Sequence, residues 1–166
     1  MAEFTLKNLA SFLVKAKIQT YAADEAEVPK EKAERPGFKE LVHKEGDFEY
    51  RDSYAGFYFA PGQEIVKYKG KPVWSMVYSG GMLPKYQSLE LAKKTYSFLK
   101  LALQKVEESR PFRGPSYLKQ KTADGAFEYV DKSSGSIGWF KGTEKILLDG
   151  KEVYRQDYIG GLILSK

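Results

Sequence analysis

The chain carries one segment twice, and this internal repeat limits the architectures that the sequence can adopt. Residues 46–83 align with residues 125–163 once a single residue is inserted in the second copy. A repeat of this length indicates one supersecondary unit used twice, so we predict two halves with internal pseudo-two-fold symmetry. The identical pairs are Gly46/Gly125, Phe48/Phe127, Glu49/Glu128, Tyr50/Tyr129, Asp52/Asp131, Gly56/Gly135, Gly62/Gly142, Glu64/Glu144, Gly70/Gly150, Lys71/Lys151, Val73/Val153, Tyr78/Tyr158, Gly80/Gly160 and Gly81/Gly161.

Length and composition are those of an ordinary globular protein. The 166 residues are 42% hydrophobic and 30% charged, which favours a single domain built of two repeats, about 1–83 and 84–166. The absence of cysteine excludes disulfides, cysteine catalysis and cysteine-based zinc sites, and His43 is the single histidine. The sequence lacks the features of a signal peptide and any stretch long enough for a transmembrane helix. We therefore expect a cytoplasmic protein with no membrane association and no cofactor.

Two segments have the apolar spacing of helices. In residues 5–21, apolar side chains recur at helical intervals, and Lys17 is expected on a different face. Residues 88–108 carry a broader apolar stripe after a candidate N-cap, Ser88, as is typical of a helix packed against a sheet. The intervening residues 22–40 are polar and contain two prolines, which predicts a flexible loop.

Each repeat has the pattern of antiparallel strands joined by tight turns. Lys69-Gly70 and Asp149-Gly150 separate segments of alternating polarity, and glycine accepts the positive φ that hairpin turns require. We therefore predict an α+β fold made of a duplicated α-ββββ unit. The predicted hairpins pair 40–44 with 47–53, 63–69 with 71–79, 116–122 with 126–132, and 143–149 with 151–159.

Side-chain alternation predicts where two of these strands lie. Strand 71–79 has apolar residues on both faces and is expected to be central and covered on both sides. Strand 151–159 is more polar and is expected nearer an edge, where pairing between chains would give a homo-oligomer. The pairs Gly80-Gly81 and Gly160-Gly161 match no phosphate-binding motif, so we predict that they form bulges or sharp exits at strand ends.

The acidic residues shared by the two repeats are candidates for acid–base chemistry or for a cation site. An acid on an apolar face has a raised pKa and can exchange protons, and clustered carboxylates bind hard cations such as Mg²⁺ or Ca²⁺. The structural alternative has Asp52 accepting hydrogen bonds from turn amides and Glu64 facing water or a lysine. Retention of these residues in both halves favours the structural alternative. The candidates are Glu49, Asp52, Glu64, Glu128, Asp131 and Glu144.

Aromatic side chains form the second group of candidates. Tyrosine and tryptophan need partners for their polar atoms, so a group of them predicts a cleft with apolar walls and a few hydroxyls. The natural place for such a cleft is the seam between the two halves, and packing in the core is the alternative. The candidate ligand-binding residues are Tyr50, Trp74, Tyr78, Tyr129, Tyr154 and Tyr158.

The net charge permits nucleic-acid binding without requiring it. The chain carries 27 lysines and arginines against 22 acidic residues, a formal charge of +5. Because the basic residues are mixed with acidic ones along the chain, a solvated surface is favoured over a nucleic-acid footprint. Binding of nucleic acid through a basic, aromatic sheet face is kept as an alternative.

Three stretches of the sequence resemble an uncharacterised prokaryotic family that is classed only as a domain of unknown function. They are the helix segment Phe12–Lys17, the strand motif Glu45–Asp52 and the hairpin motif Gly62–Met76, and the resemblance extends over nearly the whole chain. Some members of the family carry a similar domain behind a helix-turn-helix module, which implies a sensing role. In this chain a single predicted helix precedes the first repeat, so a regulatory role would need a separate partner protein.

These observations favour a non-enzymatic module that binds or senses a small molecule in an aromatic cleft between the two repeats. No catalytic motif is assembled in the sequence, so an enzyme is not the preferred interpretation. The alternatives are a carboxylate-based enzyme, with or without a metal ion, and a nucleic-acid-binding protein. The sequence does not identify a ligand.

Overall fold

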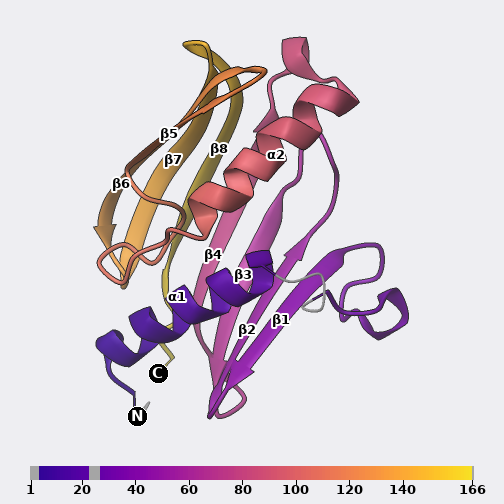
Figure 1. The fold of residues 1–166 in the computed structure, drawn as a ribbon. Helices are drawn as coiled ribbons and strands as arrows, with labels where there is room; N and C mark the ends of the chain where they lie inside the picture. Colours follow the sequence, from indigo (N-terminus) through magenta and orange to yellow (C-terminus); the bar gives the residue numbers. More distant parts are fainter. Residues whose placement is uncertain (1–3, 23–26, 166) are drawn as a thin grey trace.

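Two helices pack against one face of an antiparallel sheet (Figure 1). The computed structural model describes residues 4–22 and 27–165, and within these the sheet has eight strands. The predicted α+β class with antiparallel strands is confirmed. The elements are α1 (Leu6–Ala22), β1 (Lys39–Glu45), β2 (Phe48–Tyr54), β3 (Gly62–Tyr68), β4 (Lys71–Met82), α2 (Leu89–Leu103), β5 (Tyr117–Thr122), β6 (Gly125–Ser136), β7 (Trp139–Leu148) and β8 (Lys151–Leu162).

The strand order is β1-β2-β3-β4-β8-β7-β6-β5, so the first four strands and the last four meet at β4 and β8. All four predicted hairpins are present, with registers that follow their turns. At Lys69-Gly70 and at Asp149-Gly150 both residues have positive φ, between 48° and 77°. This is the backbone of a type I′ turn, whose twist matches that of the strands it joins. The repeated turn sequence therefore sets the same hairpin in both halves.

Most predicted helix boundaries agree with the structure. α1 covers the predicted 5–21 segment, and the side chain of Ser88 accepts a hydrogen bond from the backbone N–H of Leu91, 3.3 Å away, as an N-cap. α2 ends at Leu103, earlier than predicted. Of the predicted loop 22–40, residues 23–26 lie outside the described part, and residues 30–32 form a short 3-10 helix before β1 begins.

The paired glycines have a different role from the one predicted. Gly81 and Gly161 lie within β4 and β8, and the register shifts of the sheet occur elsewhere, after Val66 and after Ile146. A Cβ at Gly81 would overlap the backbone of Tyr58, and one at Gly161 would overlap the backbone of Gly138. The prediction of bulges or exits is therefore wrong, because these glycines let connecting segments cross the strands at close range.

The helices cover only one face of the sheet. In β4, Trp74, Met76 and Tyr78 are buried beneath the helices, whereas Val77 points to the other face and is 46% exposed. The prediction that both faces of this strand are covered is therefore wrong, and we call the uncovered side the open face. Buried apolar side chains form two clusters on the covered face, one that includes residues of α1 and one that includes residues of α2.

The position predicted for strand 151–159 is also wrong. β8 lies at the centre of the sheet, bonded to β4 on one side and β7 on the other, and the edges are β1 and β5. Arg155 and Asp157 lie on the open face, and Gln156 is a buried polar residue that bonds to Glu144 on the covered face, so the polar residues of this strand do not mark an edge. Homo-oligomer formation by pairing along this strand is accordingly not available. No helix within the described residues has the length and apolar character needed to cross a membrane.

We expect Gly81→Ala to destabilise the protein, because the new methyl group would meet backbone that cannot rotate away. Overpacking of this kind costs about 1–3 kcal/mol in unfolding free energy, measured by urea denaturation. Gly138→Ala is the matched control, since its Cβ would have no neighbour closer than 3.7 Å and should change stability by less than about 1 kcal/mol. Equal effects of the two substitutions would contradict the crossing role.

Candidate functional site

Four of the six candidate acids meet in the interior of the covered face. Asp52 on β2 lies opposite Glu64 on β3, and Asp131 on β6 lies opposite Glu144 on β7. Each is at most 3% exposed. The favoured structural interpretation is wrong for Asp52, because its carboxylate accepts a hydrogen bond from the hydroxyl of Tyr78, 2.7 Å away, and not from turn amides.

The other two candidate acids lie apart from this cluster. Alternation along the strands places Glu49 and Glu128 on the open face, where both are half-buried. Glu49 pairs with Lys44 at 2.7 Å, and Glu128 pairs with Lys119 at 3.2 Å. Surface ion pairs of this kind contribute little to stability or chemistry. Among the described residues, no group of three or more acids and histidines is arranged to hold a metal ion.

The same three-residue arrangement occurs in each half of the sheet. A tyrosine of the central strand reaches across a glycine of the next strand and donates its hydroxyl hydrogen bond to an aspartate of the strand beyond, at 2.7 Å in the first half and 2.9 Å in the second. A Cβ at either glycine would overlap the tyrosine ring. The residues are Asp52, Gly62 and Tyr78 in the first half, and Asp131, Gly142 and Tyr158 in the second.

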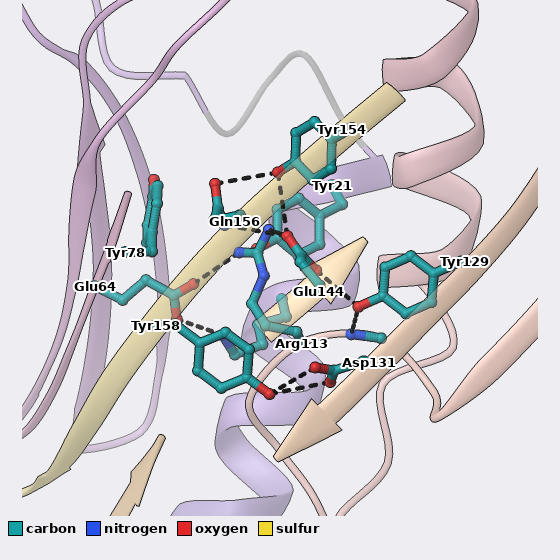
Figure 2. Close-up of polar contacts among 12 residues, drawn as sticks. Tyr21, Glu64, Tyr78, Arg113, Tyr129, Asp131, Glu144, Tyr154, Gln156 and Tyr158 are labelled. Atoms are coloured by element: carbon teal, nitrogen blue, oxygen red, sulfur yellow. Dashed lines mark hydrogen bonds and ion pairs between the residues drawn. The ribbon is translucent and has the colours of Figure 1, made fainter. Parts of the chain in front are cut away.

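Arg113 lies between the two halves and contacts a glutamate from each (Figure 2). Its guanidinium donates to Glu144 at 2.7 Å and lies 3.6 Å from Glu64, which also forms a buried ion pair with Lys17 of α1. All four side chains are 5% exposed or less. Arg113 belongs to the segment between α2 and β5, so the ion pairs join both helical regions to the sheet.

Glu144 is the most highly coordinated carboxylate of the cluster. Besides Arg113, it accepts hydrogen bonds from the hydroxyl of Tyr129 at 2.7 Å, the hydroxyl of Tyr154 at 3.2 Å and the amide of Gln156 at 3.1 Å. These donors satisfy the hydrogen-bonding capacity of a buried carboxylate without contact with water. Glu144 is thus a structural member of the network.

The two aspartates are less well compensated. Burial, followed by the negative charge of Glu64, raises the pKa of Asp52 to about 7. Burial and the charge of Glu144 raise the pKa of Asp131 to about 6, and Arg110, 2.5 Å away, counteracts part of this increase. Within the described part of the chain, Asp52 forms no ion pair. Of the two raised pKa values, that of Asp52 therefore lies closer to neutral pH.

Sequence reasoning missed the cations of this cluster. Lys17 was expected away from the apolar face of its helix, yet it is 1% exposed and lies one turn after the buried Leu13. That four-residue spacing was the signal that could have placed it on the buried face. Arg110 and Arg113 lie in an irregular segment and belong to no pattern, so no local signal marked them.

The six candidate aromatic residues lie on the covered face and are enclosed. Each is 8% exposed or less, and the indole N–H of Trp74 donates to the backbone oxygen of Ile137 at 3.2 Å. The structure places these residues on the same face as the acidic cluster, and two of them, Tyr78 and Tyr158, also contribute to the lining of a hollow. A ligand-binding role for them stays a prediction. The residues are Tyr50, Trp74, Tyr78, Tyr129, Tyr154 and Tyr158.

A hollow of about 760 Å³ lies over the central strands β4, β8, β7 and β6. Its apolar part is formed by Val77 and Ile159, and within the described part of the chain no ion pair involves its two lysines, Lys132 and Lys141. Asp157 is the acidic side chain of the hollow and accepts a hydrogen bond from Thr143 at 2.5 Å. The full lining is Val77, Tyr78, Ser79, Lys132, Ser133, Ser134, Lys141, Gly142, Thr143, Asp157, Tyr158 and Ile159.

We expect Arg113→Leu to lower the unfolding free energy by about 3–5 kcal/mol, because it leaves buried carboxylates without their cation. Adding Glu144→Gln to this variant should recover part of the loss, since the second substitution removes one of the unpaired charges. Arg155→Leu is the surface control: Arg155 pairs with Glu152 at 2.6 Å with 47% of its side chain exposed, and should change stability by less than about 1 kcal/mol. Urea denaturation measures all three, and an Arg113 effect as small as that of Arg155 would contradict the network.

Asp52 should make the protein less stable as pH rises from 6 to 8. Its pKa is about 7 in the folded chain against an ordinary value of 3.8, so the folded state holds the proton more tightly. The resulting stabilisation is complete below about pH 4 and is lost as pH rises through about 7. We expect the melting temperature to fall by roughly 2–4 °C between pH 6 and 8.

Asp52→Asn should flatten this dependence on pH while keeping an acceptor for Tyr78. Glu49→Gln is the control, because the hydrogen bond from Lys44 holds the pKa of Glu49 below its ordinary value, outside this window. An unchanged slope in the Asp52 variant would show that another group titrates.

Comparison with known proteins places the chain in a family without assigning an activity. No curated protein and no solved structure matches it. A family model described as "Domain of unknown function (DUF5680)" matches residues 52–163, which include the two central strands, Arg113 and every residue that lines the hollow. This confirms the resemblance to an uncharacterised family, and the chain belongs to the DUF5680 family of domains of unknown function.

Proposed function

We propose that this protein is a non-enzymatic module that binds a small molecule with an anionic group in the hollow on the open face. The supporting observation is the combination of an apolar floor, Val77 and Ile159, with two lysines that have no acidic partner among the described residues. A pocket that combines apolar surface with a few placed charges favours an amphipathic ligand, whose charged end is held by the lysines.

The registers place these groups in two adjacent rows across four strands. In the first row, Val77 lies beside Ile159, Ile159 beside Lys141, and Lys141 beside Ser134. The second row runs in the same way through Ser79, Asp157, Thr143 and Lys132. The first row is therefore apolar on β4 and β8 with its lysine on β7, and the second row carries Asp157 on β8, which Thr143 engages, with its lysine on β6. A ligand with an apolar part over β4 and β8 and an anionic group over β7 would match this arrangement.

The covered face supports binding in preference to catalysis. The candidate acids Asp52, Glu64, Asp131 and Glu144 are buried at 3% exposure or less, and a substrate would have to displace the helices to reach them. In the hollow, Asp157 is engaged by Thr143. The carboxylate-based enzyme is therefore the less favoured function. The six candidate aromatic residues are likewise buried on the covered face and are not exposed to stack on bases.

We also infer that the two halves of the chain derive from one duplicated unit with pseudo-two-fold symmetry. The support comes from the mirrored strand order and from the tyrosine–glycine–aspartate arrangement found on both sides of the sheet. The lysines of the hollow do not follow this repeat. In the alignment, Lys132 corresponds to Ser53 and Lys141 to Pro61. A binding site that uses these lysines would be a property of the second half.

The proposal is tested by thermal shift and calorimetry against small carboxylates, phosphates and their neutral counterparts. Anionic compounds should raise the melting temperature by mass action, and Lys141→Met should weaken their binding about tenfold. Lys145→Met is the matched control, because Lys145 lies on the same strand and face outside the hollow and pairs with Glu152 at 3.2 Å.

Two results would contradict the proposal. One is equal binding of anionic and neutral compounds, and the other is equal effects of the two lysine substitutions. A single-stranded oligonucleotide belongs in the same screen. Binding of that oligonucleotide with a steep dependence on salt would replace the proposal with the nucleic-acid alternative.

A further inference from the structure

Trp139 is an exposed tryptophan on the open face, next to the hollow. It is 78% exposed, whereas the other tryptophan of the chain, Trp74, is fully buried. The following residue, Phe140, points to the covered face and stacks on Phe112 at a centroid distance of 3.9 Å. Because strand residues alternate, Trp139 and Lys141 point together to the open face.

The neighbours of Trp139 leave the space beside its ring open. Its partners on the adjoining strands are Gly161 on β8 and Ser136 on β6, which carry no side chain or a small one. No hydrogen bond or ring contact involves Trp139 within the described part of the chain. Next to the apolar floor of the hollow, the exposed indole offers a large, flat apolar surface on which a ligand ring can stack.

Trp139 is not part of the lining of the hollow but lies in the row of the sheet next to it. Lys141 is two residues further along β7, about 7 Å away, and its cross-strand partner Ile159 is part of the apolar floor. Ile159 is the diagonal neighbour of Trp139 across the two strands, within reach of a large ring. Trp139 therefore lies one row before Ile159 and Lys141, which sit side by side, and Lys132 lies in the row after them.

We propose, resting on the binding function inferred above, that the ligand is an aromatic carboxylate of the arylalkanoate class. Its ring stacks on Trp139 over Ile159, and its carboxylate is held by Lys141 and Lys132. The spacing of about 7 Å between Trp139 and Lys141 along β7 suits a linker of a few carbons between ring and carboxylate. Stacking requires a planar ring, and the lysines require a negative charge, so both parts of the ligand are needed.

Three matched probes separate the two requirements: 3-phenylpropionate, 3-cyclohexylpropionate and 3-phenylpropanol. The second lacks the aromatic plane and the third lacks the charge. Binding is followed by titration with NMR detection of the methyl groups of Val77 and Ile159. We expect 3-phenylpropionate to bind at least about threefold more tightly than either counterpart. Its dissociation constant should rise about 3- to 10-fold in Trp139→Ala and stay nearly unchanged in Trp139→Phe.

Two further measurements control for structural damage. Trp139 is so exposed that its substitution should leave the melting temperature unchanged, and Tyr117→Ala, at a 52% exposed aromatic residue of edge strand β5, should not alter binding. Since Trp74 is buried, the change in tryptophan fluorescence on binding of 3-phenylpropionate should come from Trp139 and disappear in Trp139→Phe.

The outcomes distinguish failure of this inference from failure of the binding function. If both propionates bind equally and Trp139→Ala leaves their dissociation constants unchanged, the aromatic requirement is overturned while the anion site remains. If the alcohol binds as tightly as the acids, or if Lys141→Met has no effect on the acids, the anion site fails and this inference fails with it. Absence of binding by all three probes would overturn this inference, and the screen of small carboxylates and phosphates described above then decides the binding function separately.

Discussion

The buried contact of Arg113 with Glu64 and Glu144 sets how the rest of the molecule is assembled. The two glutamates come from β3 and β7, which flank the central pair β4 and β8, so one guanidinium spans the junction between the halves. Lys17 adds α1 to the same network. A buried ion pair contributes little net stability, but each charge requires its partner. The network therefore allows one placement of the helical regions on the sheet and penalises others.

This arrangement also decides which face of the sheet is available to other molecules. The central strands send Tyr78 and Tyr158 into the covered face, where each is held by an aspartate, and send Val77 and Ile159 to the opposite side. Because the covered face is filled by helices, aromatic rings and paired charges, a ligand there would have to displace compensated groups. A ligand that binds on the open face, over Val77 and Ile159, displaces only water. Desolvation of apolar surface then favours binding.

The sequence predicted features that depend on neighbouring residues and failed where distant segments meet. The hairpins were predictable because Lys69-Gly70 and Asp149-Gly150 determine their turns locally. The role of Gly81 could not be predicted, since the segment that crosses it, at Tyr58, is distant along the chain. The four acids were identified through the repeat, yet their convergence depends on strand order and on Arg113, which no local pattern marks. The position of β8 was predicted wrongly because a strand with one uncovered face and an edge strand both show polar residues at alternate positions in the sequence.

The two halves use their open faces differently, and this difference explains why a site would occur in only one of them. In the first half, Glu40 on the open side of β1 accepts hydrogen bonds from the backbone N–H groups of Glu34 and Arg35, at 2.9 and 3.1 Å, and is fully buried by that segment. Glu40 lies opposite Ser53, whereas the pairing of β5 begins at Tyr117 opposite Val130 and does not reach Lys132, the counterpart of Ser53. Residues shared by the repeats are thus mainly those that build the covered face. The unshared lysines of the second half remain uncovered and are therefore available to contact a ligand, whereas the shared residues preserve the fold.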